Sequence, residues 1–220
     1  MNCCQCQGIE TTFNQKVAAK KLKQYRKKGP AKTTRMLIDA LKADGIEGMA
    51  LLDIGGGVGA IQHELLSAGA SSCINVEASK AYIEAAKEEA ERQGHADRVS
   101  HHHGNFVDLA PDIPQADIVT LDRVICCYHD MQALVGLSSA LARRLYGVVY
   151  PRDIWWVKVG VAIGNFAYWI RRNPFRGFVH PTEAVDAMVR GNGLERRFYR
   201  KAGGWQVVVY ARVRSTKIHI

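Results

Sequence analysis

The sequence predicts an α/β fold built on a doubly wound sheet of seven strands, mostly parallel and ending in an antiparallel hairpin. Apolar, strand-like runs alternate with helical patterns, as they do in a parallel sheet covered by helices on both faces. Glycines occupy positions 55–57 and 59 at the end of the first apolar run, where such sheets bind ligands. Near the C-terminus, Ala202-Gly203-Gly204 separates Glu195–Arg200 from Trp205–Val213, which indicates a β-hairpin.

The first 45 residues are expected to form a tail followed by helices that cap the sheet. The segment Lys16–Lys28 carries apolar residues at helical spacing among lysines, and Gly29-Pro30 ends it. Thr33 or Thr34 is then expected to cap a second helix that continues to Leu41. A chain of 220 residues is long enough for one α/β domain and short for two. We therefore expect a single domain, with the cap in residues 1–45 and the core in residues 46–220.

The core elements follow from the alternation of apolar runs with helical patterns and turn residues. After the first strand, which starts at Ala50, we expect a helix at Ala60–Leu66, a strand at Ser72–Val76, a helix at Lys80–Gln93 closed by Gly94, strands at Val99–His103 and Asp117–Leu121, a helix at Met131–Arg144 and a strand at Leu145–Tyr150.

The segment Ile154–Ile170 is almost wholly apolar, with aromatic residues near both ends. A membrane span needs about 20 apolar residues, whereas this segment is shorter and contains Lys158 and Asn165. A buried helix or a hydrophobic lid is therefore favoured over contact with a membrane surface, although peripheral membrane contact stays open.

Composition restricts the partners and the compartment. The net charge of +9 suits nucleic acid, an anionic membrane surface or an acidic small molecule. The segment before Gly29 is polar and then basic, unlike a signal peptide, so a cytoplasmic location is expected. Cys3, Cys4 and Cys6 contain one CxxC, short of the four ligands of a closed zinc site, so no metal is expected. Cys126 or Cys127 could complete the set only if the N-terminal tail folds across the mouth of the site.

The glycine-rich turn has two acidic companions. Gly55, Gly57 and Gly59 allow the backbone to turn sharply and to approach a ligand closely. Glu77 ends the next apolar run, where a carboxylate can accept hydrogen bonds from both hydroxyls of a ribose. Asp53 precedes the turn, and the whole pattern, DxGxGxG followed by a strand ending in Glu, resembles that of the class I S-adenosylmethionine-dependent methyltransferases.

A second interpretation of the same turn stays open. A dinucleotide fingerprint, GxGxxG/A, runs through Gly55, Gly57 and Ala60 and would suit an NAD(P)-dependent oxidoreductase. The C-terminal hairpin favours the methyltransferases, because that family adds an antiparallel pair to the Rossmann-like plan.

The resemblance implies S-adenosylmethionine as the cofactor. By resemblance Asn105 binds the adenine and Phe106 flanks its ring, although a plain turn explains these two residues equally well. Asp122 would fix either the methionine end of the cofactor or the turn after the fourth strand. The cofactor-binding residues expected are Asp53, Gly55, Gly57, Gly59, Glu77, Asn105, Phe106 and Asp122.

The segment after the fourth strand narrows the resemblance. Its LDxVIxxY pattern, Leu121–Tyr128, is similar to a segment of the magnesium-protoporphyrin O-methyltransferases, which esterify a tetrapyrrole propionate. This likeness is confined to residues 121–130. Tyr128 and His129 are the candidate catalytic residues, with His129 as a base and Tyr128 as an orienting or capping group. A structural role for His129 is nearly as well supported, because it has no evident partner in the sequence.

Three further residues are expected to contact the substrate. Arg152, which follows the fifth strand, can clamp an acidic group. Trp155 begins the apolar segment, and His180 precedes another helix. The function expected is methyl transfer to oxygen or sulfur of a small hydrophobic or acidic molecule, by a monomer or homodimer. The alternatives are the oxidoreductase and an RNA methyltransferase or basic-surface binder. A nucleic-acid partner is disfavoured, because the motifs of RNA cytosine and base-amino methyltransferases are absent.

Overall fold

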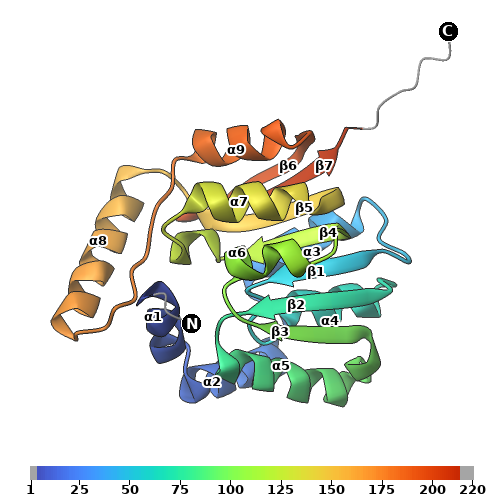
Figure 1. Cartoon of the computed structure of the whole chain (residues 1–220), viewed down its shortest axis with the longest axis horizontal. Coiled ribbons are helices and arrows are strands. Elements are labelled where there is room, and N and C mark those ends of the chain that lie inside the picture. The colour runs from blue at the N-terminus through green and yellow to red at the C-terminus, as the bar shows by residue number, and fades with distance from the viewer. Residues whose placement is uncertain (1–3, 214–220) are drawn as a thin grey trace, which may run out of the picture.

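A computed structural model describes residues 4–213, with side chains from residue 8 onward. One seven-stranded sheet forms its centre, in the order β3-β2-β1-β4-β5-β7-β6 (Figure 1). The strands β3, β2, β1, β4 and β5 pair in parallel with their neighbours, and β7 runs antiparallel to both β5 and β6. The predicted fold class, including the C-terminal hairpin, is confirmed.

The strands are β1 Ala50–Ile54, β2 Ser72–Glu77, β3 Val99–His103, β4 Ala116–Asp122, β5 Ala142–Pro151, β6 Leu194–Ala202 and β7 Trp205–Arg212. The helices are α1 Cys4–Thr12, α2 Gln15–Lys28, α3 Lys32–Lys42, α4 Ala60–Ser67, α5 Lys80–Gln93, α6 Phe106–Leu109, α7 Met131–Ala140, α8 Trp155–Ile170 and α9 Thr182–Gly191. Three short 3₁₀ turns lie at Ala96–Arg98, Ala110–Asp112 and Ile125–Cys127.

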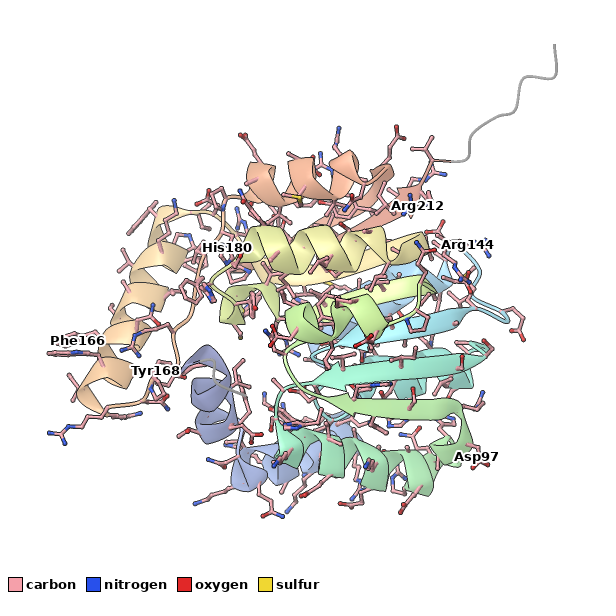
Figure 2. All side chains as sticks on the ribbon, in the orientation of Figure 1. Asp97, Arg144, Phe166, Tyr168, His180 and Arg212 are labelled. Carbon is pink, nitrogen blue, oxygen red and sulfur yellow. The ribbon has the colours of Figure 1, made fainter. Side chains whose placement is uncertain are left out.

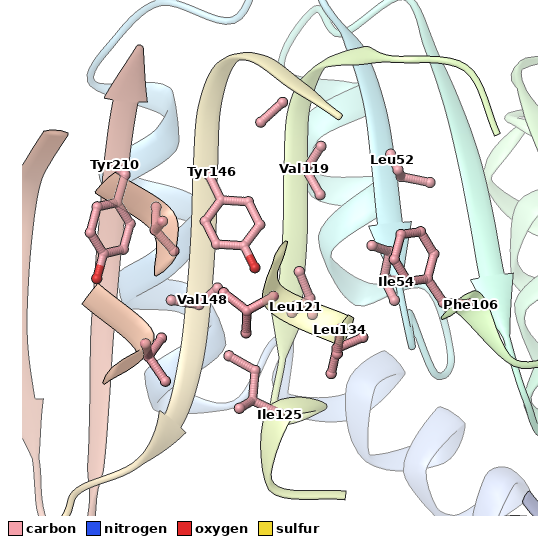
Figure 3. Close-up of a cluster of buried hydrophobic side chains, with 14 of the residues drawn as sticks. Leu52, Ile54, Phe106, Val119, Leu121, Ile125, Leu134, Tyr146, Val148 and Tyr210 are labelled. Carbon is pink, nitrogen blue, oxygen red and sulfur yellow. The ribbon is translucent and has the colours of Figure 1, made fainter. Parts of the chain in front are cut away.

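Apolar side chains cover both faces of the sheet, because successive residues of a strand point to opposite faces. Leu51 packs in the cluster formed with α3 and α4, whereas Leu52 packs in the cluster formed with α7 and α9. Figure 3 shows part of the second cluster, including Tyr146 and Tyr210. The Tyr146 hydroxyl lies 2.8 Å from Ser138 Oγ, so its polar end is satisfied within the core.

The cap starts with α1, which the sequence did not reveal as a helix. α2 matches the predicted Lys16–Lys28 closely and packs against α5. The expected threonine cap of the next helix is wrong, because α3 begins at Lys32 with Ala31 as its N-cap. The proline before Ala31 already restricts the backbone at the start of α3. Thr34 is instead buried and bonded to a distant strand.

Two expectations for the second half are corrected. The helix predicted to reach Arg144 ends at Ala140, because Ala142 already pairs with Ala116 at the start of β5. The apolar segment does form a helix, α8, but Val157 is its one buried residue. Of the two favoured alternatives, the buried helix is wrong, whereas the hydrophobic lid stays a prediction.

Candidate active site

A cavity of about 400 Å³ opens at the carboxyl ends of the parallel strands. Its walls come from the glycine-rich turn after β1, the end of β2, the turns after β3 and β4, and the helices α1 and α2. Of the residues predicted to bind the cofactor, the ones that line it are Asp53, Gly55, Gly57, Glu77, Asn105, Phe106 and Asp122. Residues that lie between Asp53 and Asp122 in the sequence thus come together around one cavity, as the sequence pattern predicted.

The glycine-rich turn exposes its backbone to this cavity. Gly55 has φ +65° and donates a 2.7 Å hydrogen bond to the carbonyl of Val76, which ties the turn to β2. Gly57 has φ +57°, and a Cβ added there would meet no atom of the described residues within 4 Å. Since Gly57 lines the cavity, such a Cβ would project into the space that a ligand needs. Gly59, at φ +81°, is the N-cap of α4.

Glu77 holds the turn from the neighbouring strand. Its Oε2 accepts a 3.0 Å hydrogen bond from Gly57 N–H, and its Oε1 accepts a 2.9 Å bond from Ser79 N–H. Burial raises the pKa of this carboxyl, while the backbone donors oppose the increase. Each carboxylate oxygen has a second lone pair. Glu77 can therefore accept hydrogen bonds from a ligand without releasing Gly57 or Ser79.

Asp53 lies beneath the turn and is fully buried. Its Oδ1 accepts a 2.7 Å hydrogen bond from Thr120 Oγ1, whereas Oδ2 has no hydrogen-bond partner among the described residues. Burial raises the pKa of Asp53 to about 7. Asn75 Oδ1 likewise has no hydrogen-bond partner in the described part of the chain. It approaches the same point of the turn, since a Cβ added to Gly56 would lie 2.7 Å from Asp53 Oδ2 and 2.8 Å from Asn75 Oδ1. The base of the site thus contains two acceptor oxygens, Asp53 Oδ2 and Asn75 Oδ1, to which the described protein atoms donate no hydrogen bond.

The turn after β3 is connected to the segment after β4. Asn105 Nδ2 donates a 3.1 Å hydrogen bond to the hydroxyl of Tyr128, and Asn105 Oδ1 caps α6 through Val107 N–H at 3.4 Å. Phe106 is buried against the core and shows only part of its ring to the cavity. The amide of Asn105 therefore orients Tyr128, which also lines the cavity.

Asp122, at the end of β4, is bonded to the cap. It accepts a 2.6 Å hydrogen bond from the hydroxyl of Thr34 on α3. It also forms an ion pair with Arg123, at 3.0 Å. Arg123 adopts φ +62°, an uncommon conformation for a residue with a side chain. This cluster fixes the turn after the fourth strand, which was one of the two roles considered for Asp122.

Five predicted residues are not among those that line the cavity: Gly59, His129, Arg152, Trp155 and His180. His129 stacks on Tyr128, with 5.2 Å between ring centroids, and is itself exposed. His180 Nε2 lies 2.9 Å from the carbonyl oxygen of Tyr128 and so supports the same segment. Arg152 donates to the carbonyl of Gly203 at 3.0 Å and borders a separate polar hollow. Trp155 is 76% exposed on α8.

Helix α1 and Phe13, the residue that follows it, also contribute to the walls, which was not predicted from the sequence. Ile9 and Phe13 line the cavity, and Phe13 makes an edge-to-face contact with Phe175 at 5.6 Å. Their spacing of four residues is a helical signal that was available in the sequence. Cys126 and Cys127 also line the cavity, with their sulfur atoms 3.8 Å apart. Cys3, Cys4 and Cys6 lie outside the described side chains.

This fold and this site define a class I S-adenosylmethionine-dependent methyltransferase. A family model, the O-methyltransferase domain, matches residues 5–143, which is more than half of the chain. The protein belongs to this family. The resemblance inferred from the glycine-rich turn and Glu77 is thereby confirmed, and the nicotinamide-dependent alternative is not supported. A comparison with curated proteins finds no match.

Solved structures with the same fold include three methyltransferases. The magnesium protoporphyrin IX methyltransferase ChlM of Synechocystis PCC 6803, with bound SAH, has a TM-score of 0.73 at 16% identity. The match covers 95% of this chain and 100% of that chain. An O-methyltransferase family protein of Burkholderia thailandensis has a TM-score of 0.68 at 16% identity, with coverages of 93% and 62%. An O-methyltransferase family 2 protein of Planctomyces limnophilus DSM 3776, in complex with apigenin, has a TM-score of 0.60 at 16% identity, with coverages of 84% and 63%.

Proposed function

We propose that the protein transfers the methyl group of S-adenosylmethionine to a carboxylate oxygen of a small hydrophobic acid. The observation that carries this proposal is the cavity itself, where the open backbone at Gly57 and the buried carboxylate of Glu77 share a wall with apolar side chains. Bound S-adenosylmethionine would supply a methyl group that is already activated by its sulfonium.

The residues of the chain would divide the work of binding that cofactor. The Gly55–Gly59 turn would lie against it without steric conflict, and Glu77 would accept hydrogen bonds from its ribose hydroxyls. Phe106 and Asn105 would border the adenine, with Asn105 acting mainly through the turn it caps. The unpartnered oxygen of Asp53 would accept a hydrogen bond from the bound ligand or from a water molecule beneath it.

The preference for a carboxylate acceptor follows from the bases that the cavity offers. Its carboxylates, Asp53, Glu77 and Asp122, already accept hydrogen bonds from the protein. None of the described residues that line the cavity is a histidine. A carboxylate is ionised at neutral pH and needs no base, whereas an alcohol or phenol would benefit from one. Alignment and exclusion of water would then be the main requirements.

Tyr128 is the residue we propose to touch the acceptor. Asn105 fixes its hydroxyl, His129 stacks on its ring and His180 contacts its backbone, so the phenol is held from three sides. His129 would act through Tyr128 as a positioning residue, not as the base considered from the sequence. Because the ChlM neighbour is named for magnesium protoporphyrin IX and the LDxVIxxY pattern is local to residues 121–128, flat aromatic acids belong in the first substrate panel.

The test is transfer from methyl-labelled S-adenosylmethionine to hydrophobic carboxylic acids, each paired with its amide and with a phenol of similar size. The expected product is a methyl ester, recognised by release of labelled methanol in base. Labelling of the phenols but not of the acids would contradict the carboxylate proposal. Failure of the folded protein to bind S-adenosylhomocysteine in a calorimetric titration would contradict the cofactor site.

Several properties stay predictions beside this proposal. A single domain over residues 1–220, a cytoplasmic location and a monomeric or homodimeric state are each open to direct measurement. Arg152, Trp155 and His180 stay candidates for substrate contact only if the acceptor extends beyond the cavity toward α8.

A further inference from the structure

Helix α8 presents an apolar stripe along its whole length to the outside of the molecule. The residues of this stripe recur at helical spacing and include Trp155, Val159, Ile163, Phe166, Trp169 and Ile170. Phe166 is 60% exposed and Trp169 is 64% exposed, although both are large aromatic side chains. Figure 2 shows Phe166 pointing away from the rest of the protein. A continuous apolar surface of this kind marks an interaction site.

The opposite side of α8 is already occupied. The amide of Asn165 forms two hydrogen bonds with the backbone of Gly177, at 2.8 and 2.7 Å. Tyr168 packs edge-to-face on Phe175, with 5.2 Å between ring centroids. The returning segment 173–180 therefore holds α8 in place, and the exposed stripe is a fixed feature of its orientation.

The charges around the stripe identify what would cover it. The segment from Ile154 to Pro181 carries four basic residues and no carboxylate: Lys158, Arg171, Arg172 and Arg176. Lys158 is paired with Asp153 at 2.6 Å, and Arg176 donates to the carbonyls of Asn173 and Phe175. Docking would therefore depend on the charges of Arg171 and Arg172. Arg171 and Arg172 are exposed at the C-terminal end of α8, next to Trp169. Tryptophan beside arginine and lysine on an apolar helix is the composition of helices that lie in the interface of anionic membranes.

A second copy of the chain suits this surface less well. A two-fold dimer would place the same patch on both sides of the interface. The exposed Arg171 and Arg172 would then meet a copy of the same surface, in which residues 154–181 offer them no carboxylate. Anionic phospholipid head groups provide the missing negative charge.

We propose that α8 docks in the head-group interface of an anionic phospholipid bilayer, with its axis along the membrane plane and the stripe toward the acyl chains. No helix in the described part of the chain is long and apolar enough to cross a membrane. The docked helix would stay connected to the site, because Asn173 bonds Thr12 of α1 and Phe178 N–H bonds the carbonyl of Cys126. Docking would thus bring two walls of the cavity close to the bilayer.

The first experiment uses the tryptophans of the unmodified protein. Trp155, Trp156 and Trp169 lie on α8, and the chain has four tryptophans in all. Vesicles with 30 mol% phosphatidylglycerol in phosphatidylcholine should shift the fluorescence to the blue, and brominated acyl chains should quench it. Vesicles of phosphatidylcholine alone should bind at least about tenfold more weakly, because the charge contribution is lost. Equal binding to both compositions, or no binding to either, would overturn the proposal.

The second experiment places the contact on α8. The double variant Ile163→Glu/Phe166→Glu should lower binding to the anionic vesicles about tenfold or more, since two charges would enter the apolar interface. Leu137→Glu, at an exposed leucine of α7, is the matched control and should bind as the wild type does. Arg171→Glu should also weaken binding, whereas Arg144→Glu, on the far side of the molecule in Figure 2, should change it little.

Thermal unfolding would verify that each variant is folded, and the bromolipid quenching of the wild-type protein stands independently of the variants. Sedimentation velocity would be run in parallel on the wild type and the α8 double variant. If the double variant converts a dimer to a monomer and leaves vesicle binding unchanged, the stripe is a self-interface and the proposal is wrong.

Discussion

The hydroxyl of Thr34 donates a 2.6 Å hydrogen bond to Asp122 Oδ2, although the two residues are 88 positions apart. Arg123 completes the cluster, since its Nη2 lies 3.1 Å from Thr34 Oγ1 and 3.0 Å from Asp122 Oδ2. The cluster joins α3 of the cap to the end of β4, at the wall of the cavity. Formation of the site and attachment of the cap are therefore coupled.

Replacing Thr34 by Val tests this coupling with little change of volume. Asp122 would lose one donor but keep Arg123, so we expect a loss of about 1 kcal/mol in the free energy of unfolding. Urea unfolding at pH 7 measures it. Thr33→Val, one position earlier and with its hydroxyl in no hydrogen bond between the described residues, should change stability by less than about 0.5 kcal/mol. Equal losses in both variants would show that the hydrogen bond contributes nothing specific.

The sequence predicted those parts of the fold and the site that local patterns determine. The strand Val99–His103 and the helix Lys80–Gln93 were predicted with their observed bounds, because alternation, helix formers and a closing glycine lie within each segment. The turn at Gly55–Gly59 and Glu77 were found in the same way. Each of these signals is contained in a few neighbouring residues.

The rest depended on contacts between distant segments. Nothing near Thr34 indicates that its hydroxyl is bonded to Asp122 instead of capping a helix. A buried α8 was one of the favoured alternatives because an apolar sequence ordinarily predicts burial. Its orientation is set by Asn165 and the returning segment at Gly177, which no periodicity reveals. Arg152 likewise follows the fifth strand as expected, yet its guanidinium is directed to the hairpin turn at Gly203.

Replacing Glu77 by Gln should weaken binding of S-adenosylhomocysteine by about tenfold to a hundredfold, since hydrogen bonds to a charged acceptor contribute about 1.5 to 3 kcal/mol. The amide can accept only through one atom, so the bond to Gly57 or to Ser79 is also lost. Isothermal titration gives the affinity, and thermal unfolding reports the loss of the backbone contact. Glu91→Gln, an exposed site on α5, makes the same change of charge and should bind normally. Unaltered affinity in Glu77→Gln would remove this residue from the cofactor site.

Replacing Gly57 by Leu separates the cost of backbone strain from the cost of filling the cavity. Gly57 has φ +57° and Gly203 has φ +59°, and at both positions an added Cβ would have no atom of residues 4–213, as far as these are described, within 4 Å. Both substitutions should therefore destabilise the protein by a similar amount, about 1 to 2 kcal/mol. Gly57→Leu alone should abolish measurable binding of S-adenosylhomocysteine. If Gly203→Leu, in the hairpin turn, weakens binding as much, the effect is one of general stability and not of the site.

A buried histidine pair beneath the sheet makes stability depend on pH. His63 Nδ1 lies 3.1 Å from His95 Nδ1, and both rings are buried. Burial, with a further contribution from His95, lowers the pKa of His63 to about 4. The unfolded chain then takes up a proton near pH 6.5, where the folded protein does not. The contribution of His63 is therefore fully present above pH 6.5 and is lost progressively as the pH falls from 6.5 to about 4.

Asp53 acts in the opposite direction, so the pH dependence of the wild type alone cannot isolate His63. Its raised pKa, about 7, means that the folded protein takes up this proton first as the pH falls, which stabilises the fold toward acid. The difference between the wild type and His63→Gln removes this contribution, since Asp53 is present in both. The contribution of His95 should also be similar in the wild type and in His63→Gln, because its pKa is lowered by its own burial and by Arg98, and not by His63. From pH 7 to pH 5, the free energy of unfolding of the wild type should fall by about 2 kcal/mol relative to His63→Gln. Urea unfolding at both pH values gives this difference, and a constant difference between the two proteins would show that His63 titrates alike in the folded and unfolded states.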